Sequence, residues 1–179
     1  MGFPNHLRET PSLNRYLLVF GSLFLLSQAL IVWLLGEVGL QLLALQTTFT
    51  KAGFTSLVNE WGLAEYEKLR MHYRLDMLHP IWYALFLAAL LAKLFNANNA
   101  SKRYDTFIWT PVIAGCCDFA ENAIHAAFVY HVYSMPQPWI FLGGLFATAK
   151  WFLAVGATAA ILALCGRYCL ESASQNRRT

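Results

Sequence analysis

Four polar side chains that could exchange protons or bind a ligand lie within eight residues of an otherwise apolar stretch, in the segment DFAENAIH. They are three, four and seven positions from the first, so an α-helix places all four along one face: Asp118, Glu121, Asn122 and His125. An uncompensated charge at the centre of a bilayer costs at least about 2.5 to 3.5 kcal/mol, so ionisable groups there are paired or functional. The two acids therefore need partners from other segments.

A second polar stripe precedes and overlaps the second long apolar run of the chain. Its members also share one helix face, at spacings of four, seven and eleven positions: His72, Asp76, His79 and Tyr83. Lys150 supplies a cation from the last apolar run. Counting about 1.5 Å per residue from the outer helix ends places Lys150 level with Glu121, so we expect an ion pair of Lys150 with Glu121 or Asp118.

The same depth count places two further groups. Gln28, in the first apolar run, lies at a depth comparable with His125 and can reach the same cavity. Asp76 falls about 16 Å from Glu121 along the membrane normal. The count therefore predicts that Asp76 lies apart from the acids of the first stripe.

Two kinds of metal-free site fit these residues. In a structural site, Lys150 neutralises an acid, and Asn122 and Gln28 hydrogen-bond between helices to fix their assembly. In a catalytic or ligand-binding site, Lys150 pairs with only one acid. The other acid then exchanges protons with His79 or His125 in a dry pocket, because burial brings carboxyls and imidazoles to titrate near neutrality.

A dimetal site and a proton-coupled carrier are further hypotheses. Asp76 with His79, and Glu121 with His125, would donate to metals from two facing helices. The Glu-x-x-His repeat of dimetal bundles is missing, so we assign no metal ligand and no cofactor. A carrier needs a polar route from both faces, and the stripe from Asp118 does not continue to the inner end of its helix.

The elements that must hold these residues are membrane-spanning helices. Of 179 residues, 58% are hydrophobic and 13% charged, unlike soluble domains. Apolar runs long enough to cross about 30 Å of hydrocarbon predict one all-α domain, an up-down bundle of four transmembrane helices over about 16–35, 64–95, 111–132 and 139–165. The second helix starts outside the bilayer, and Pro80 kinks it where it meets the membrane.

The connection after the first span is unusually apolar. Residues 36–62 include Leu40, Leu45, Phe49, Phe54 and Trp61, which are unfavourable in free solvent. We therefore expect this segment to cap the bundle or to lie on the membrane.

The basic residues predict an orientation. Arg8 and Arg15 precede the first span, Lys102 and Arg103 follow the second, and Arg167 follows the fourth, which places both termini in the cytoplasm. The polar stripes then lie toward the outer leaflet. The net charge of +3 comes without a basic stripe, so we expect no nucleic-acid partner.

Five short stretches resemble, in the same order, a widespread group of small four-helix integral membrane proteins: LQTTFT, WG, LDMLHPIWY (LDxxxPxxY), DFAENAIH (DxxEN) and AKWFLAVG. The resemblance covers about 40–156. It implies a shared polar site made of Asp76, Tyr83, Asp118, Glu121, Asn122 and Lys150. This chain departs from the group at Gln46, where an acid is more usual, and at His79, where a bulky apolar residue is usual.

The sequence thus predicts a multi-pass membrane protein with an intramembrane polar site. We expect the site to bind, or to process by acid-base chemistry, a small apolar or lipid-like molecule from the outer leaflet. Asp118, Glu121 and Asp76 are the candidate catalytic acids. The candidate ligand-binding residues are Asn122, Tyr83, Lys150, His79, His125, Gln28 and Gln46. The alternatives are a noncatalytic subunit, with a protein partner or a second copy, whose polar groups are structural, and a proton-coupled carrier.

Overall fold

The computed structural model describes residues 2–130 and 136–176, which form helices joined by short connections, with no strand among them. The all-α class is therefore confirmed. The elements in chain order are α1 (Phe3–Glu9), α2 (Leu13–Leu35), η1 (Gly36–Val38), α3 (Gly39–Gln46), α4 (Lys51–Asn59), α5 (Leu63–Asp76), α6 (His79–Ala97), η2 (Lys102–Ile108), α7 (Trp109–Tyr130) and α8 (Gln137–Asn176).

Four stretches of the described chain are long and apolar enough to cross a membrane: Leu13–Gln46, His79–Ala97, Lys102–Tyr130 and Gln137–Ser174. Each overlaps one of the four predicted spans, with different bounds. Residues 131 and 132, the predicted end of the third span, lie outside the described residues. The fourth helix does not end at residue 165, because helix-forming residues continue and Arg167 pairs with Glu171 one turn later, at 2.7 Å.

The predicted helix 64–95 is divided. α5 ends at Asp76 and α6 begins at His79, so the break lies at Met77 and Leu78, before Pro80 rather than at it. Proline lacks an N–H and is tolerated in the first turn of a helix, where that donor has no intrahelical acceptor. Pro80 does mark an interruption of the predicted helix, but it lies in the first turn of a new helix and does not kink a continuous one. Asp76 consequently sits at a helix end.

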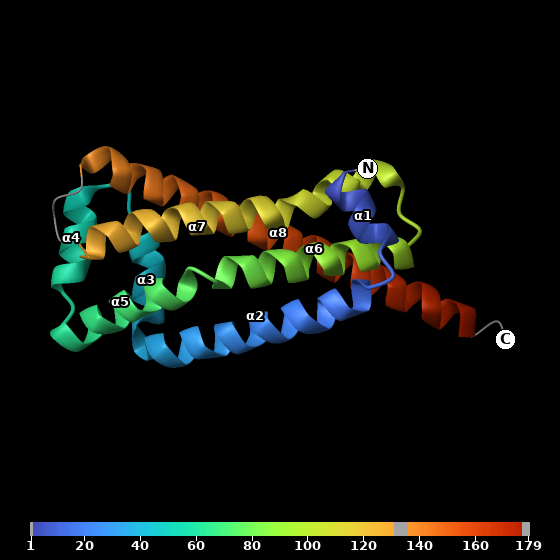
Figure 1. Ribbon diagram of the computed structural model, residues 1–179, viewed down its shortest axis with the longest axis horizontal. Coiled ribbons are helices and arrows are strands. Elements are labelled where there is room, and N and C mark those ends of the chain that lie inside the picture. The colour runs from blue at the N-terminus through green and yellow to red at the C-terminus, as the bar shows by residue number, and fades with distance from the viewer. Residues whose placement is uncertain (1, 131–135, 177–179) are drawn as a thin grey trace.

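The long helices pack in chain order. α2 packs on α6, α6 on α7, and α7 on α8, with α8 also touching α6 (Figure 1). Gly115 allows α7 to approach α6, since a Cβ there would lie 2.9 Å from the Ala84 Cβ and 3.0 Å from the Pro80 carbonyl oxygen. α2 and α8 are not among the extensively packed pairs of the described chain.

The two ends of the molecule differ. α1 and the last turns of α8 lie at one end, whereas α3 and α4 lie at the other (Figure 1). The segment after the first span packs through its apolar residues, with Leu45 and Phe54 fully buried and both α3 and α4 in contact with α8. This segment therefore covers the helices that carry the polar stripes.

Candidate intramembrane site

Lys150 is bound by two carboxylates from α7. Its Nζ donates to Asp118 Oδ1 at 2.7 Å and also to Glu121 Oε2. All three side chains are buried. The predicted ion pair is confirmed, but the expectation that Lys150 would leave one of these two acids free is wrong.

Glu121 is also held by a histidine on its own helix. His125 Nδ1 lies 2.8 Å from Glu121 Oε1, one turn away, and a neutral ring donates its N–H to the carboxylate. The opposite ring nitrogen faces α8, where a Cβ on Gly143 would lie 2.6 Å from His125 Nε2. The Phe54 ring covers the imidazole with centroids 5.1 Å apart. Glu121 and His125 thus form a closed, fully buried unit with Lys150.

Asp76 has a different environment. Asn122 Nδ2 donates to the Asp76 carbonyl oxygen at 3.0 Å and to Asp76 Oδ2 at 3.1 Å. His72 Nε2 lies 3.4 Å from the same Oδ2. No Lys or Arg of the described chain forms an ion pair with Asp76. Its carboxyl therefore meets an amide and an imidazole in place of a cation.

The separation of about 16 Å predicted between Asp76 and the α7 stripe is wrong, since Asp76 bonds directly to Asn122. The outer end of α7 lies beside α5 and not beside the start of α6. Tyr130 donates to the Arg70 carbonyl oxygen at 2.9 Å, and Tyr66 donates to that of Val129. The depth count assumed that the second and third predicted helices leave the membrane where their apolar runs end. Because α5 is polar, its sequence does not show that it packs beside the outer end of α7.

Burial changes the titration of the α5 pair. It raises the pKa of Asp76 to about 6, against the opposing effects of the Lys150 cation and the Asn122 hydrogen bond. Burial lowers the pKa of His72 to about 4, so this imidazole is neutral at neutral pH. Neither ring nitrogen of His72 has a hydrogen-bond partner among the described residues. Asp76 can therefore gain or lose a proton at a pH of about 6, whereas His72 stays neutral there.

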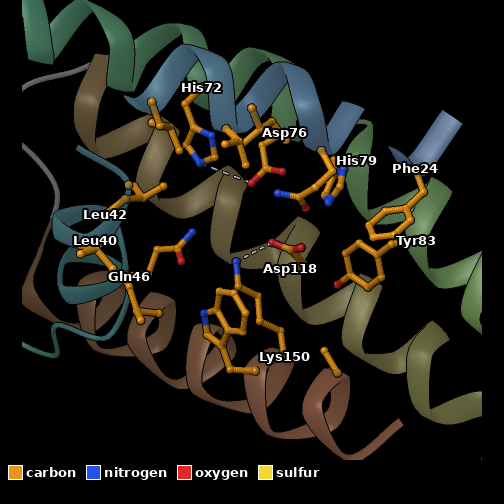
Figure 2. Close-up of a pocket in the computed structure, with 18 of the residues that line it drawn as sticks. Phe24, Leu40, Leu42, Gln46, His72, Asp76, His79, Tyr83, Asp118 and Lys150 are labelled. Atoms are coloured by element: carbon orange, nitrogen blue, oxygen red, sulfur yellow. Dashed lines mark hydrogen bonds and ion pairs between the residues drawn. The ribbon is translucent and has the colours of Figure 1, made fainter. Parts of the chain in front are cut away.

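A cavity of about 460 Å³ connects these groups (Figure 2). Its walls come from α2, α3, α5, α6, α7 and α8. Seven of the predicted site residues line it: Gln28, Gln46, Asp76, His79, Tyr83, Asp118 and Lys150. The other three lie behind the wall, where they hold the lining groups: Glu121, Asn122 and His125.

His79 and Tyr83 form the α6 wall. Ser27 Oγ lies 2.8 Å from His79 Nδ1 and 3.0 Å from the Phe24 carbonyl oxygen, so this hydroxyl holds the His79 ring against α2. The hydroxyl of Tyr83 points toward Asp118 (Figure 2). The His79 ring is flanked by Phe24 and Tyr83, with centroids 5.6 and 5.5 Å away.

The rest of the cavity is apolar and reaches the molecular surface. Ile31, Leu35 and Leu42 line it from buried positions. Val32 on α2 and Leu40 on α3 also line it but are 60% and 85% exposed, and Trp151 on α8 is 45% exposed. The cavity is therefore a lateral opening between α2, α3 and α8.

The sequence did not reveal every wall residue. Phe24, Ser27 and Trp151 were missed, although Phe24 precedes Gln28 by one turn and Trp151 follows Lys150. An apolar residue on a membrane helix faces either lipid or a cavity, and its type does not distinguish the two. His72 was recognised in the polar stripe but not chosen as a site residue. Its spacing of four from Asp76 was the available signal.

Within the described residues there is no cluster of three or more His, Cys, Asp or Glu side chains arranged to hold a metal ion. Comparisons with protein-family models, curated proteins and solved structures gave no match.

Proposed function

We propose that this protein binds a small apolar or lipid-like molecule in the lateral cavity and holds its polar end against Asp76. The observation that carries the proposal is a buried carboxyl without a cationic partner at the end of an apolar cavity. Ligand pockets are commonly apolar concavities of about 300 to 1,000 Å³ with a few converging polar groups. A carboxyl used only for assembly gains nothing from facing such a space.

The proposal includes an orientation. The four spans form an up-down-up-down bundle with both termini in the cytoplasm, so the cavity opens to the outer leaflet beneath α3 and α4. The positions of Arg8, Lys102, Arg103 and Arg167 support it, because basic residues favour the cytoplasmic side. A single-chain lipid can then reach Asp76 sideways without crossing the membrane.

Acid-base chemistry follows from the same groups. Asp76 is the proton-exchanging acid, with a pKa of about 6, and His72 is a neutral neighbouring acceptor. Asp118 and Tyr83 orient the bound molecule. Lys150 pairs with Asp118, and Asn122 holds Asp76 in place.

A structural role is the second candidate for part of the polar set. Lys150 pairs with both Asp118 and Glu121, and Glu121 is closed off by His125. Such a network fixes how α7 and α8 pack and needs no ligand. We assign Glu121 and His125 to this role, and the cavity-facing groups to binding.

Native mass spectrometry of the full chain in a nonionic detergent tests the proposal. The probes are hexadecanol, hexadecanoic acid and hexadecylamine, and the blocked variant is Ala154→Phe, which fills the cavity wall on α8. Ala159→Phe, at an exposed position of the same helix, is the matched control. We expect at least one probe to be retained by the wild type and by Ala159→Phe, and lost from Ala154→Phe. Equal retention by all three proteins, or none by any, would refute binding in this cavity.

A further inference from the structure

We infer that the polar end of the bound molecule is a protonated amine, so that the ligand class is a single-chain cationic amphiphile. This inference rests on the proposed binding function and specifies its ligand. It follows from the charge, the hydrogen-bonding capacity and the aromatic rings of the polar end of the cavity.

The charges leave the polar end of the cavity acidic. Three carboxyl groups lie at this end or directly behind it with one ammonium, because Asp118 and Glu121 share Lys150 and Asp76 has no cation of its own. The nearest imidazole to Asp76, that of His72, is neutral at neutral pH. An anionic head group such as a carboxylate would be repelled by these acids. A cationic group supplies the missing charge.

Several hydrogen-bonding groups that line the cavity can accept from a ligand. Asp76 offers its carboxylate, and the His79 ring presents Nε2, because Nδ1 is bonded to Ser27. His72 is 2% exposed, lines the cavity and has no hydrogen-bond partner on either ring nitrogen among the described residues. An alkylammonium has three N–H donors and no acceptor. Its donors match the Asp76 carboxylate and the acceptor nitrogen of the neutral His72 ring.

The donors that contact the acids are already in use. Lys150 donates to two carboxylates, and the amide of Asn122 donates to the Asp76 carbonyl and carboxylate oxygens. These bonds hold the acids in place, and the other donors that line the cavity, which include the Gln28 and Gln46 amides, are uncharged. They also keep the Asp76 carboxylate at a fixed position for a cation.

Aromatic rings surround the same end. Phe24 and Tyr83 flank the His79 ring, and Trp151 lies on the α8 side of the cavity. Ring faces attract cations, most strongly when water is excluded, and recognition of amines by rings combined with a carboxylate uses both effects. The apolar residues of α2 and α3 beyond them fit the alkyl chain. The cavity thus has one end for a cation and one for a hydrocarbon.

Affinities of the full chain for hexadecylamine, hexadecanol and hexadecanoic acid, measured at a pH of about 7.5, test this inference. The amine should bind at least about tenfold more tightly than the alcohol, because its hydrogen bonds to Asp76 are charge-assisted. Asp76→Asn should lower amine affinity about tenfold and alcohol affinity by less, because only the amine loses an ion pair. The wild-type comparison of amine with alcohol stands even if this variant does not fold.

The outcomes separate the two proposals. Equal or tighter binding of the alcohol or the acid, abolished by Ala154→Phe, would overturn the amine specificity and leave the lipid-binding function standing. Binding of none of the probes would overturn both. Amine binding that persists in Ala154→Phe would place the amine outside the cavity and also overturn the inference.

Discussion

The three buried acids of the site differ in the side chains that their carboxyl oxygens contact. Asp118 and Glu121 share the Lys150 ammonium, whereas Asp76 meets only the neutral groups of Asn122 and His72. A buried carboxylate without a cation destabilises the folded state when it ionises. We therefore expect the Asp76 carboxylate to lower the stability of the folded protein while it contributes to ligand binding.

Replacing Asp76 by Asn should stabilise the protein at neutral pH. Burial raises the pKa of Asp76 from 3.8 to about 6, so its contribution to stability is full below pH 3.8 and is lost as pH rises through about 6. The loss corresponds to about 3 kcal/mol, which the neutral amide avoids. The melting temperature of Asp76→Asn in detergent should exceed that of the wild type at a pH of about 7.5 and approach it at about 4.5.

His72 also affects the melting temperature. Its pKa is lowered in the folded protein, so its contribution to stability is lost as the pH falls, which is the opposite of Asp76. The groups that face Asp76 are otherwise shared by the two proteins: Asn122 and Glu121 from α7, Lys150 from α8, and His79 and Gln28 across the cavity. The difference in melting temperature between Asp76→Asn and the wild type therefore reports the effect of the Asp76 carboxyl. A lower melting temperature for Asp76→Asn at neutral pH would show that this carboxylate serves assembly.

Replacing Lys150 by Met should have the opposite effect. It leaves two buried carboxylates without their cation, and breaking a buried pair in this way costs about 3 to 5 kcal/mol. Adding Glu121→Gln removes one of those charges and should recover much of the loss. Melting temperature and the yield of monodisperse protein measure both steps. A Lys150→Met variant as stable as the wild type would contradict the pairing.

At the residue scale, much of the site was predictable. The spacings of Asp118, Glu121, Asn122 and His125 placed them on one helix face, and the apolar surroundings required the Lys150 partner. The partners of Asp76 were not predictable, because helix spacing fixes a side chain's direction but not its depth relative to another helix. That register depends on contacts such as Tyr130 with Arg70, between residue types that suit many partners.

Among the elements, α8 must approach α7 closely enough to bring Lys150 to the acids. Gly143 provides this approach by leaving room for the buried His125 ring. Gly156 lies thirteen residues further along α8, and a Cβ added there would meet open space, with nothing within 4 Å. The two glycines differ only in their neighbours and form a matched pair.

We expect Gly143→Ala to destabilise the protein by about 1 to 3 kcal/mol, because its Cβ would lie 2.6 Å from His125 Nε2 and push α8 away. Gly156→Ala should be neutral or stabilising by up to about 1 kcal/mol, since alanine favours the helix. Thermal unfolding of the two variants in the same detergent checks this. Similar effects of both substitutions would show that His125 does not pack against α8 as described.

The helices themselves were predicted from apolar run length, and their ends were not. α8 continues to Asn176 since nothing at residue 165 stops a helix, and the break between α5 and α6 falls before Pro80. Polar helices such as α5 are held by tertiary contacts, including Tyr66 with Val129, which sequence periodicity does not report. The break matters for the site, because it places Asp76 at the end of α5 and His79 at the start of α6.

For the molecule as a whole, the proposed function depends on its orientation in the membrane. A cysteine at exposed Glu60, after α4, and one at exposed Ala173, near the end of α8, should lie on opposite sides. In a background without the four native cysteines, a membrane-impermeant maleimide added to sealed, right-side-out membranes should label Glu60→Cys. Ala173→Cys should react only after the membranes are opened. The reverse pattern would turn the cavity toward the inner leaflet.

The position of the cavity opening between α2, α3 and α8 could not be predicted from the sequence. The opening arises because α2 packs on α6 while α8 packs on both α6 and α7, and α3 lines the space between α2 and α8. Apolar residues of α2, α3 and α8 then line a cavity that ends at Asp76 and Asp118 (Figure 2). Packing of this kind depends on the fit of all six elements at once.

Photolabelling with a hexadecylamine that carries a diazirine in its chain tests the central claim most directly. After irradiation of the full chain in lipid nanodiscs, mass spectrometry of its peptides should find the label on cavity residues such as Ile31, Leu42 and Ala154. Excess unlabelled amine should remove that label and leave any on outward-facing Phe152. Label confined to outward-facing positions, or cavity label that excess amine does not displace, would contradict the account.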